Sequence, residues 1–334
     1  MIWLTWRQFR TQTIVAAAAL AATAVLLGLA GVHLAHLYAS TGAAGCSAGH
    51  DCGQASATFL NLINATLLNH LPLLFGTSLI AVPVILGMFW GAPLITRELE
   101  AGTQRLAWSQ SVSRASWLAI KLGVACVAAV VTAGAFSLLV TWSAGPIDAV
   151  NLNRLQPTVF SERGIAPAGY AVFAIALGAT AGVLIRRTVP AMAVTLVVFT
   201  AVQFAMRALR QYLLAPVRLI SPISRADIGN IAAQAGPGGG TSHVVLTGNV
   251  NVPGAWVLST QFINAAGHVV SSVRPLASTS GSGQVLAGRG YRQLVTYQPA
   301  SRFWAFQWYE TAIFVALAAG LVAVCFWWIR HRMS

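Results

Sequence analysis

The sequence predicts an α-helical, multi-pass membrane protein with six transmembrane helices. Of its 334 residues, 57% are hydrophobic and only 8% are charged, whereas soluble domains carry about 25% charged residues. Several apolar runs of roughly 20 residues are long enough to cross a bilayer. Few segments alternate as membrane β-strands do, so we expect the spanning elements to be helices.

The N-terminal segment, residues 1–13, is amphipathic, and we expect it to form a helix on the membrane surface. The first span follows at 14–34 and has no charged residue. Arg7 and Arg10 before an apolar core also resemble a cleaved signal peptide. This core is longer than the 7–15 residues usual in signal peptides, so we expect a retained helix.

Residues 35–70 form a polar loop that would be extracellular if the N-terminus is cytoplasmic. An extracellular compartment is oxidising, so Cys46 and Cys52 are expected to form a disulfide. A metal site is the alternative, because four further side chains with ligand chemistry lie nearby: His33, His36, His50 and Asp51. Their spacing matches no standard zinc pattern.

The other spans are expected at 71–95, 117–142, 168–185, 189–206 and 304–329. Cytoplasmic segments would be 96–116, 186–188 and 330–334, and extracellular segments would be 143–167 and 207–303. Pro83 predicts a kink in the second span. Alternating residues on either side of Asn264–Gly267 predict a β-hairpin. We therefore expect a small mixed α/β extracellular domain between the fifth and sixth spans.

Charges on the short loops predict the orientation. The loop at 35–70 has no Lys or Arg, whereas the segments on the other side of the predicted spans carry several. This predicts that both termini lie in the cytoplasm. The net charge of +13 does not indicate nucleic-acid binding, because the arginines are scattered at the ends of apolar runs and not clustered on one face.

The chain has none of the common catalytic motifs. It lacks the phosphate loop G-x-x-x-x-G-K-[ST], H-E-x-x-H and G-x-S-x-G. We therefore expect no catalytic residues, no metal site and no cofactor in this chain, and no enzymatic activity of its own. A secondary carrier is disfavoured because the spans lack paired acidic and histidine residues.

Glu310 is the one carboxylate near a span. It could be a gating or substrate contact. The alternative is an interfacial carboxylate that reaches water or pairs with an arginine such as Arg207.

The loop at 96–116 is the most informative segment. Its sequence predicts the end of one span, then a short surface helix of mixed charge, and then a second helix capped by Ser113. A rigid element of this kind can transmit a partner's movement into two attached spans. A plain solvated loop is the alternative.

The same loop carries a family resemblance. Its E-x-G-T motif, Glu100–Thr103, is followed about eighteen positions later by Lys121. This pattern resembles the cytoplasmic signature of permease subunits of type-2 ATP-binding-cassette exporters. The wider segments RELEAGTQRLAWSQSVSR and YRQLVTYQPASRFWAFQWYETAIF resemble the actinobacterial branch.

The resemblance implies six spans, an N-terminal surface helix and a coupling helix between spans two and three. It also implies two permease copies, which we expect to be a homodimer, and two ATPase subunits that bind ATP and Mg. Substrate would cross at the permease–permease interface. The residues implied in ATPase coupling are Arg97, Glu98, Glu100, Gly102, Thr103 and Arg105. The alternative function is a membrane-anchored sensor or assembly protein that acts through its extracellular domain.

Overall fold

The structure, a computed structural model, describes residues 2–45, 53–65, 67–78, 80–102, 113–151, 154–223, 231–235, 244–248, 254–270, 272–273 and 288–332. The chain forms two compact units. A helical unit comprises 1–151, 157–210 and 304–334, and a strand unit comprises 152–156 and 211–303.

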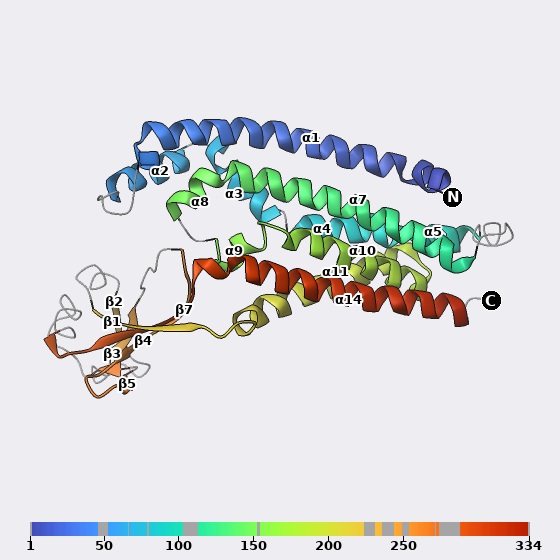
Figure 1. Ribbon diagram of the computed structural model, residues 1–334. Helices are drawn as coiled ribbons and strands as arrows, with labels where there is room; N and C mark the ends of the chain where they lie inside the picture. Colours follow the sequence, from blue (N-terminus) through green and yellow to red (C-terminus); the bar gives the residue numbers. More distant parts are fainter. Residues whose placement is uncertain are drawn as a thin grey trace. The chain divides into compact units, whose positions relative to one another are not determined.

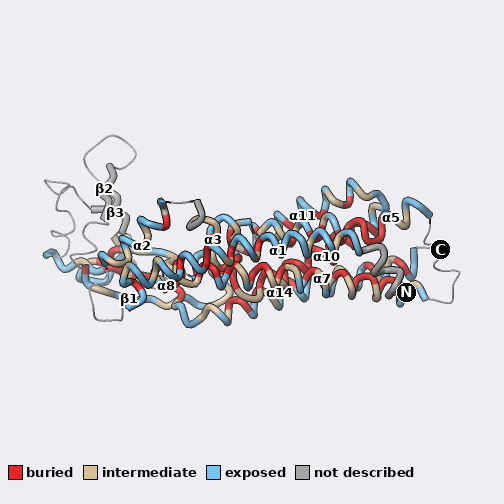
Figure 2. The backbone as a smooth tube through the Cα atoms, turned by 90° about the horizontal axis from the view of Figure 1, so that it is seen from above, coloured by how far each residue is buried: buried red, intermediate tan, exposed pale blue. Residues whose placement is uncertain are grey.

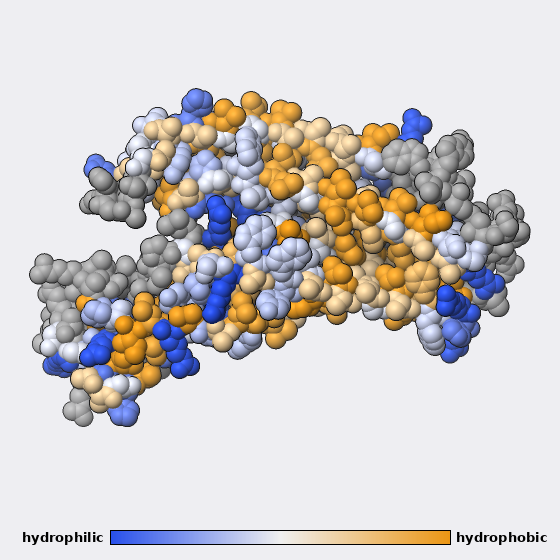
Figure 3. Space-filling view, viewed as in Figure 1, coloured by the Kyte–Doolittle hydropathy of each residue, from blue (hydrophilic) through white to orange (hydrophobic). Residues whose placement is uncertain are grey.

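Six helices in the described part of the chain are long and apolar enough to cross a membrane, as predicted. They cover Arg10–Ser40, Ala81–Ala101, Arg114–Ser143, Ala166–Ile185, Thr188–Tyr212 and Ala300–Arg332. The corresponding elements are α1 (Ile2–Ser40), α4 (Ala81–Leu86) with α5 (Pro93–Ala101), α7 (Arg114–Ser143), α10 (Ala166–Ile185), α11 (Thr188–Leu209) and α14 (Phe303–Arg332) (Figure 1). Hydrophobic side chains cover much of the middle of the helical unit, as expected of a surface that faces lipid (Figure 3).

The start of α1 and the end of α14 lie at the same end of the helical unit, which we call the terminus end (Figure 1). The chain differs here from the expected separate surface helix at 1–13, because α1 is one helix from Ile2 to Ser40. No proline or glycine interrupts it before Gly28, so nothing in the backbone chemistry separates a surface helix from the span.

The second span begins later than expected. Where one helix was expected at 71–95, the chain forms the end of α3 (Leu67–Ser78) and then the helix Ala81–Ala101, in which α4, a π-helical segment η2 (Gly87–Gly91) and α5 follow one another. The short helix α2 (Gly53–Ala65) precedes them, in the segment expected as the loop 35–70. The interruption before α4 lies about one turn ahead of Pro83. Proline has no backbone N–H, so Pro83 cannot donate the helical hydrogen bond to the carbonyl four residues earlier. In η2 the Ala92 amide bonds to the Gly87 carbonyl at 2.9 Å, a five-residue spacing that widens the helix.

Helix α10 is the centre of the helical unit. It packs against α4, η2, α5, α7 and α11, and its residues are mostly buried (red in Figure 2). Glycines allow the backbones to touch. A methyl group on Gly178 would overlap the Gly87 carbonyl and lie 2.7 Å from the Ala92 nitrogen, and one on Gly91 would lie 2.8 Å from the Ile175 carbonyl oxygen.

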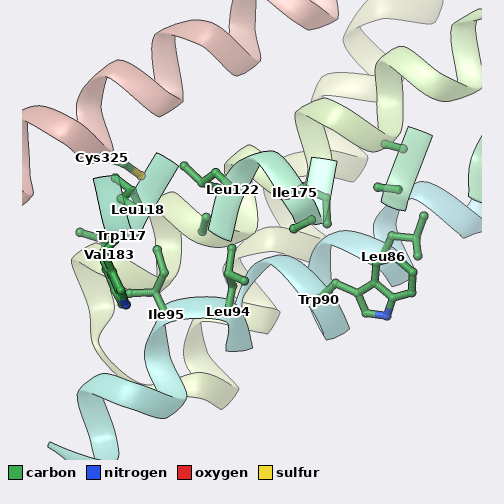
Figure 4. Close-up of a cluster of buried hydrophobic side chains, with 14 of the residues drawn as sticks. Leu86, Trp90, Leu94, Ile95, Trp117, Leu118, Leu122, Ile175, Val183 and Cys325 are labelled. Atoms are coloured by element: carbon green, nitrogen blue, oxygen red, sulfur yellow. The ribbon is translucent and has the colours of Figure 1, made fainter. Parts of the chain in front are cut away.

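Larger side chains fill the space around these close contacts. Leu86 and Trp90 of α4 and η2, Leu94 of α5, Leu122 of α7 and Cys325 of α14 belong to one buried cluster (Figure 4). The segment expected as the loop 143–167 also contains two short helices, α8 (Gly145–Asn151) and α9 (Pro157–Phe160).

The strand unit contains two antiparallel sheets. The larger has the order β1 (Val217–Pro222), β7 (Arg292–Gln298), β4 (Trp256–Ile263), β5 (Val269–Val270), and the smaller has β2 (Ile231–Ala235), β3 (Val244–Gly248), β6 (Ser272–Val273). The predicted hairpin is confirmed: β4 pairs with β5, and the Asn264 side chain accepts a bond from the His268 amide at 2.9 Å. The expected mixed α/β domain is, in the residues described here, a β-structure.

Candidate functional site

Helix α5 ends at Gly102, at the start of the segment expected to contact an ATPase. Gly102 has a φ of +68°, and its amide bonds back to the carbonyls of Glu98 and Leu99. This left-handed conformation favours glycine and closes the helix. The predicted coupling residues Thr103 and Arg105 lie outside the described residues, as do the predicted disulfide partners Cys46 and Cys52.

Glu98 connects α5 to α7. Its carboxylate forms an ion pair with Lys121, a buried side chain that also lies 4.9 Å from the centre of the Trp117 ring. The predicted cap of α7 is confirmed, because Ser113 accepts a hydrogen bond from the Ser116 amide at 3.1 Å. The start of α7 is therefore fixed both by its own cap and by α5.

Glu100 connects α5 to α11. One carboxylate oxygen accepts the Thr188 amide at 2.7 Å, and the other accepts the Thr188 hydroxyl at 2.9 Å. Thr188 begins α11, whose own preceding residue, Arg187, provides no side-chain cap. Glu100 therefore satisfies an amide of the first turn, where the helix dipole also favours negative charge. The Thr188 hydroxyl also lies 2.7 Å from that of Thr96.

We call these two connections, Glu98–Lys121 and Glu100–Thr188, the α5 clamp. They join the end of one span to the starts of two others, all at the terminus end. Arg97 is not part of the clamp: it is exposed and borders a cavity beside α1. The sequence identified both glutamates, but not Thr188, because nothing local to Thr188 indicates a partner from α5.

Glu310 lies at the opposite end of the helical unit and is fully buried. The Glu310 carboxylate does not reach water, and it pairs with Arg210 and not with Arg207. The Nε and Nη2 atoms of Arg210 lie 2.8 and 2.9 Å from the two carboxylate oxygens of Glu310. It also accepts a hydrogen bond from the Tyr170 hydroxyl. The pair is thus bidentate, the strongest geometry available to arginine and carboxylate.

Arg210 also holds the segment between α7 and α10. It donates to the Ser161 hydroxyl at 2.9 Å and to the Pro157 carbonyl at 3.1 Å, and its guanidinium lies 4.3 Å from the centre of the Phe160 ring. The Arg210–Glu310 pair therefore joins α9, the end of α11 and the first turns of α14.

Glu162 lies beside this network and is nearly fully buried. Its pKa is raised to about 7, mainly because burial disfavours the charged carboxylate; Arg163 and Arg207 lower the pKa, and Asp148 contributes to raising it. Arg163 is committed mainly to Asp148, with Nε 3.3 Å from the Asp148 carboxylate. Glu162 therefore changes charge near neutral pH.

A cavity of about 330 Å³ lies between α4 and α11, and we call it the α11 cavity. It is lined by Ile80, Ala81, Val84, Phe199, Thr200, Gln203, Phe204 and Arg207. Gln203 is 5% exposed, and its amide nitrogen has no hydrogen-bond partner in the described part of the protein. The buried Nε of Arg207 is likewise unpartnered there. The lining therefore combines apolar side chains with the polar side chains of Thr200, Gln203 and Arg207.

Among the described residues, no three His, Cys, Asp or Glu side chains come together as a metal site would require. His50 and Asp51, part of the metal alternative raised above, lie outside those residues.

Comparison with known proteins identifies the family. The family described as "ABC-2 membrane transporter related" matches residues 17–210, more than half of the chain, from within α1 to the end of α11. Searches of curated proteins and of solved structures found no match. With its six apolar helices, the chain is a multi-pass membrane permease of the ABC-2 type, and it belongs to the ABC-2 membrane transporter related family.

Proposed function

We propose that the chain is the permease subunit of an ATP-driven exporter, with both termini on the cytoplasmic side of a bacterial plasma membrane. Two copies would form the translocation path, and two separate ATPase subunits would bind ATP and Mg and supply the energy. The wider sequence segments quoted above favour the actinobacterial branch. The observation that carries the coupling part of this proposal is the α5 clamp.

The clamp suggests how an ATPase would move the permease. The segment 103–112 is the proposed docking site, and α5 precedes it directly. Force on this segment would reach α7 through Glu98–Lys121 and α11 through Glu100–Thr188. Three spans would then respond to one contact. A solvated loop without these cross-helix bonds would change its own conformation under the force and would not move α7 or α11.

The α11 cavity is the proposed contact for substrate. It lies between two spans, α4 and α11, and its lining combines apolar side chains with Gln203 and Arg207. We propose that this wall faces the second permease copy, so that the path is lined by both copies. Substrate with an apolar body and an anionic or carbonyl group matches this lining.

The first test is purification of the full chain from its native host in detergent, with identification of the proteins that accompany it. We expect an ATPase subunit with a phosphate loop in equal number to the permease. Recovery without such a subunit would reject the exporter proposal. It would favour the alternative of a sensor or assembly protein acting through the strand unit, most of which lies beyond the family match.

The second test addresses coupling within that complex. Glu100→Gln and Thr188→Val should lower the amount of substrate moved per ATP hydrolysed, because each weakens the bond between α5 and α11. Thr141→Val is the matched control, since this exposed threonine only bonds to its own helix at the Ser137 carbonyl. Unchanged transport per ATP in both clamp variants would refute the coupling role.

A further inference from the structure

A second cavity, separate from the proposed substrate path, lies between α1, α4, η2 and α7. We call it the α1 cavity. Its volume is about 500 Å³, within the range of about 300–1,000 Å³ typical of ligand sites. It is lined by Thr11, Gln12, Val15, Ala16, Ala19, Leu20, Val82, Ile85, Leu86, Phe89, Trp90, Arg97, Thr132 and Phe136.

The polar groups of this cavity gather at the terminus end. Thr11, Gln12 and Arg97 lie there, whereas the rest of the wall is almost entirely apolar. Gln12 is already engaged, because its amide donates to the Phe89 carbonyl at 3.1 Å. Thr132, on the far wall, bonds to the Ala128 carbonyl of its own helix. The cavity is thus an apolar slot with a charged rim.

Arg97 supplies the charge of the rim. It is exposed, and no carboxylate within the described ranges pairs with it. The two glutamates nearest in sequence, Glu98 and Glu100, are bonded to Lys121 and Thr188. The exposed Arg10 of α1 adds a second positive charge close in sequence to the rim residues Thr11 and Gln12. An anionic group is therefore the complement of this rim.

The dimensions match one leaflet of a bilayer. From Thr11 to Leu20, α1 rises about 13 Å at 1.5 Å per residue, close to half of the ~30 Å hydrocarbon core. The wall includes Val15, Ile85 and Phe89, which are 64%, 49% and 52% exposed. The slot is therefore accessible from the membrane, where water is absent and acyl chains fill apolar space.

We infer that the α1 cavity binds an anionic phospholipid of the leaflet at the terminus end, with one acyl chain in the slot and the phosphate at Arg97. This ligand is not the exported substrate. It would fill the space between α1 and the rest of the helical unit. The inference needs neither an ATPase nor a particular transport direction, so it stands or fails apart from the proposed function.

A photoreactive lipid tests the location directly. The full chain would be reconstituted in phosphatidylcholine vesicles that contain a small amount of phosphatidylglycerol with a diazirine at mid-chain, irradiated, digested and mapped by mass spectrometry. We expect cross-links concentrated in segments 11–20 and 82–90. An even distribution over all six spans would overturn the inference. So would segments 11–20 and 82–90 that carry no lipid cross-link, because the slot would then be closed to acyl chains.

Variants test the slot and the rim separately. Ala19 lines the cavity and Ala18 does not, although both are exposed on α1. Ala19→Trp should abolish the concentrated cross-linking, and Ala18→Trp should retain it. Arg97→Gln should keep acyl-chain cross-linking but remove a roughly fivefold preference for phosphatidylglycerol over phosphatidylcholine, the magnitude expected for one arginine at an anionic headgroup.

Two results would contradict the assignment even if Ala19→Trp fails to fold. One is wild-type cross-linking that unlabelled phosphatidylcholine displaces as well as unlabelled phosphatidylglycerol does. The other is Arg97→Gln with an unchanged preference for phosphatidylglycerol. Either result would show that the rim does not recognise the headgroup.

Discussion

Replacing Glu310 with leucine should destabilise the helical unit by about 3–5 kcal/mol, the cost typical of leaving one partner of a buried ion pair uncompensated. Glu310 is 0% exposed and Arg210 1% exposed, and two bonds of 2.8 and 2.9 Å join them. In the variant the guanidinium keeps only two neutral acceptors, Ser161 and the Pro157 carbonyl. Its low exposure also keeps solvent from replacing the carboxylate.

Two further variants separate the charge from the hydrogen bonds. Tyr170→Phe removes only a neutral donor to Glu310 and should cost about 1–2 kcal/mol. The double variant Arg210→Met with Glu310→Leu removes both charges. It should be less destabilised than Glu310→Leu alone, because only neutral groups are then left without partners. The two single changes are therefore strongly non-additive in a double-mutant cycle.

The assay is unfolding of the full chain in mixed micelles of increasing SDS content, followed by circular dichroism and tryptophan fluorescence. Destabilisation of less than about 1 kcal/mol in Glu310→Leu would refute the reasoning, since that value is typical of exposed pairs. A double variant as unstable as the sum of the two single variants would also refute it.

Three other changes follow from the structure. The pKa of Glu162 is raised to about 7 in the folded protein from an ordinary value of 4.5. Stability should therefore fall as pH rises from about 4.5 to 7, and Glu162→Gln, tested by thermal unfolding in detergent against pH, should remove that fall. Gly178→Ala should cost at least about 1–3 kcal/mol, because its methyl group would overlap the Gly87 carbonyl. Gly134→Ala, with open space at the same position, is the control, and an equal melting temperature for both would contradict the packing. Ser113→Ala should lower the stability of α7 by about 1 kcal/mol, because it removes the side-chain cap of that helix; hydrogen exchange at the first turn of α7 would detect the loss.

Much of the fold follows from the sequence because the membrane limits the choices. Uninterrupted apolar runs with charged ends can only cross as helices, and the six spans predicted match in number the six candidate membrane helices of the described residues. The hairpin at Asn264–Gly267 was predicted because turn chemistry is local. The interruption before α4 and the π-helical segment η2 were not predicted in this form. Pro83 indicated a kink, but the form of the kink depends on the glycine contacts with α10.

The site was predictable only in part, for a related reason. Glu98, Glu100 and Lys121 were all named from the sequence, but not their contacts: Glu98 pairs with Lys121, 23 residues away, and Glu100 bonds to Thr188, 88 residues away. Arg210 and Glu310 are separated by 100 residues. Such pairs are set by helix packing, which apolar composition alone does not encode. The unpartnered donors of the α11 cavity are invisible to sequence for the same reason.

The glycine contacts of α10 also decide which parts of the permease can move. Where two helix backbones touch without intervening side chains, neither helix can slide or rotate without a steric clash. Helices α4, η2, α5 and α10 should therefore move as one rigid block. Helix α1 differs along its length: its first half borders a cavity of about 500 Å³, whereas Gly31 brings its second half against Trp142 and Ser143 of α7. The first half of α1 is therefore the part of this helix that can move most freely against the block, with the contact at Gly31 as its pivot.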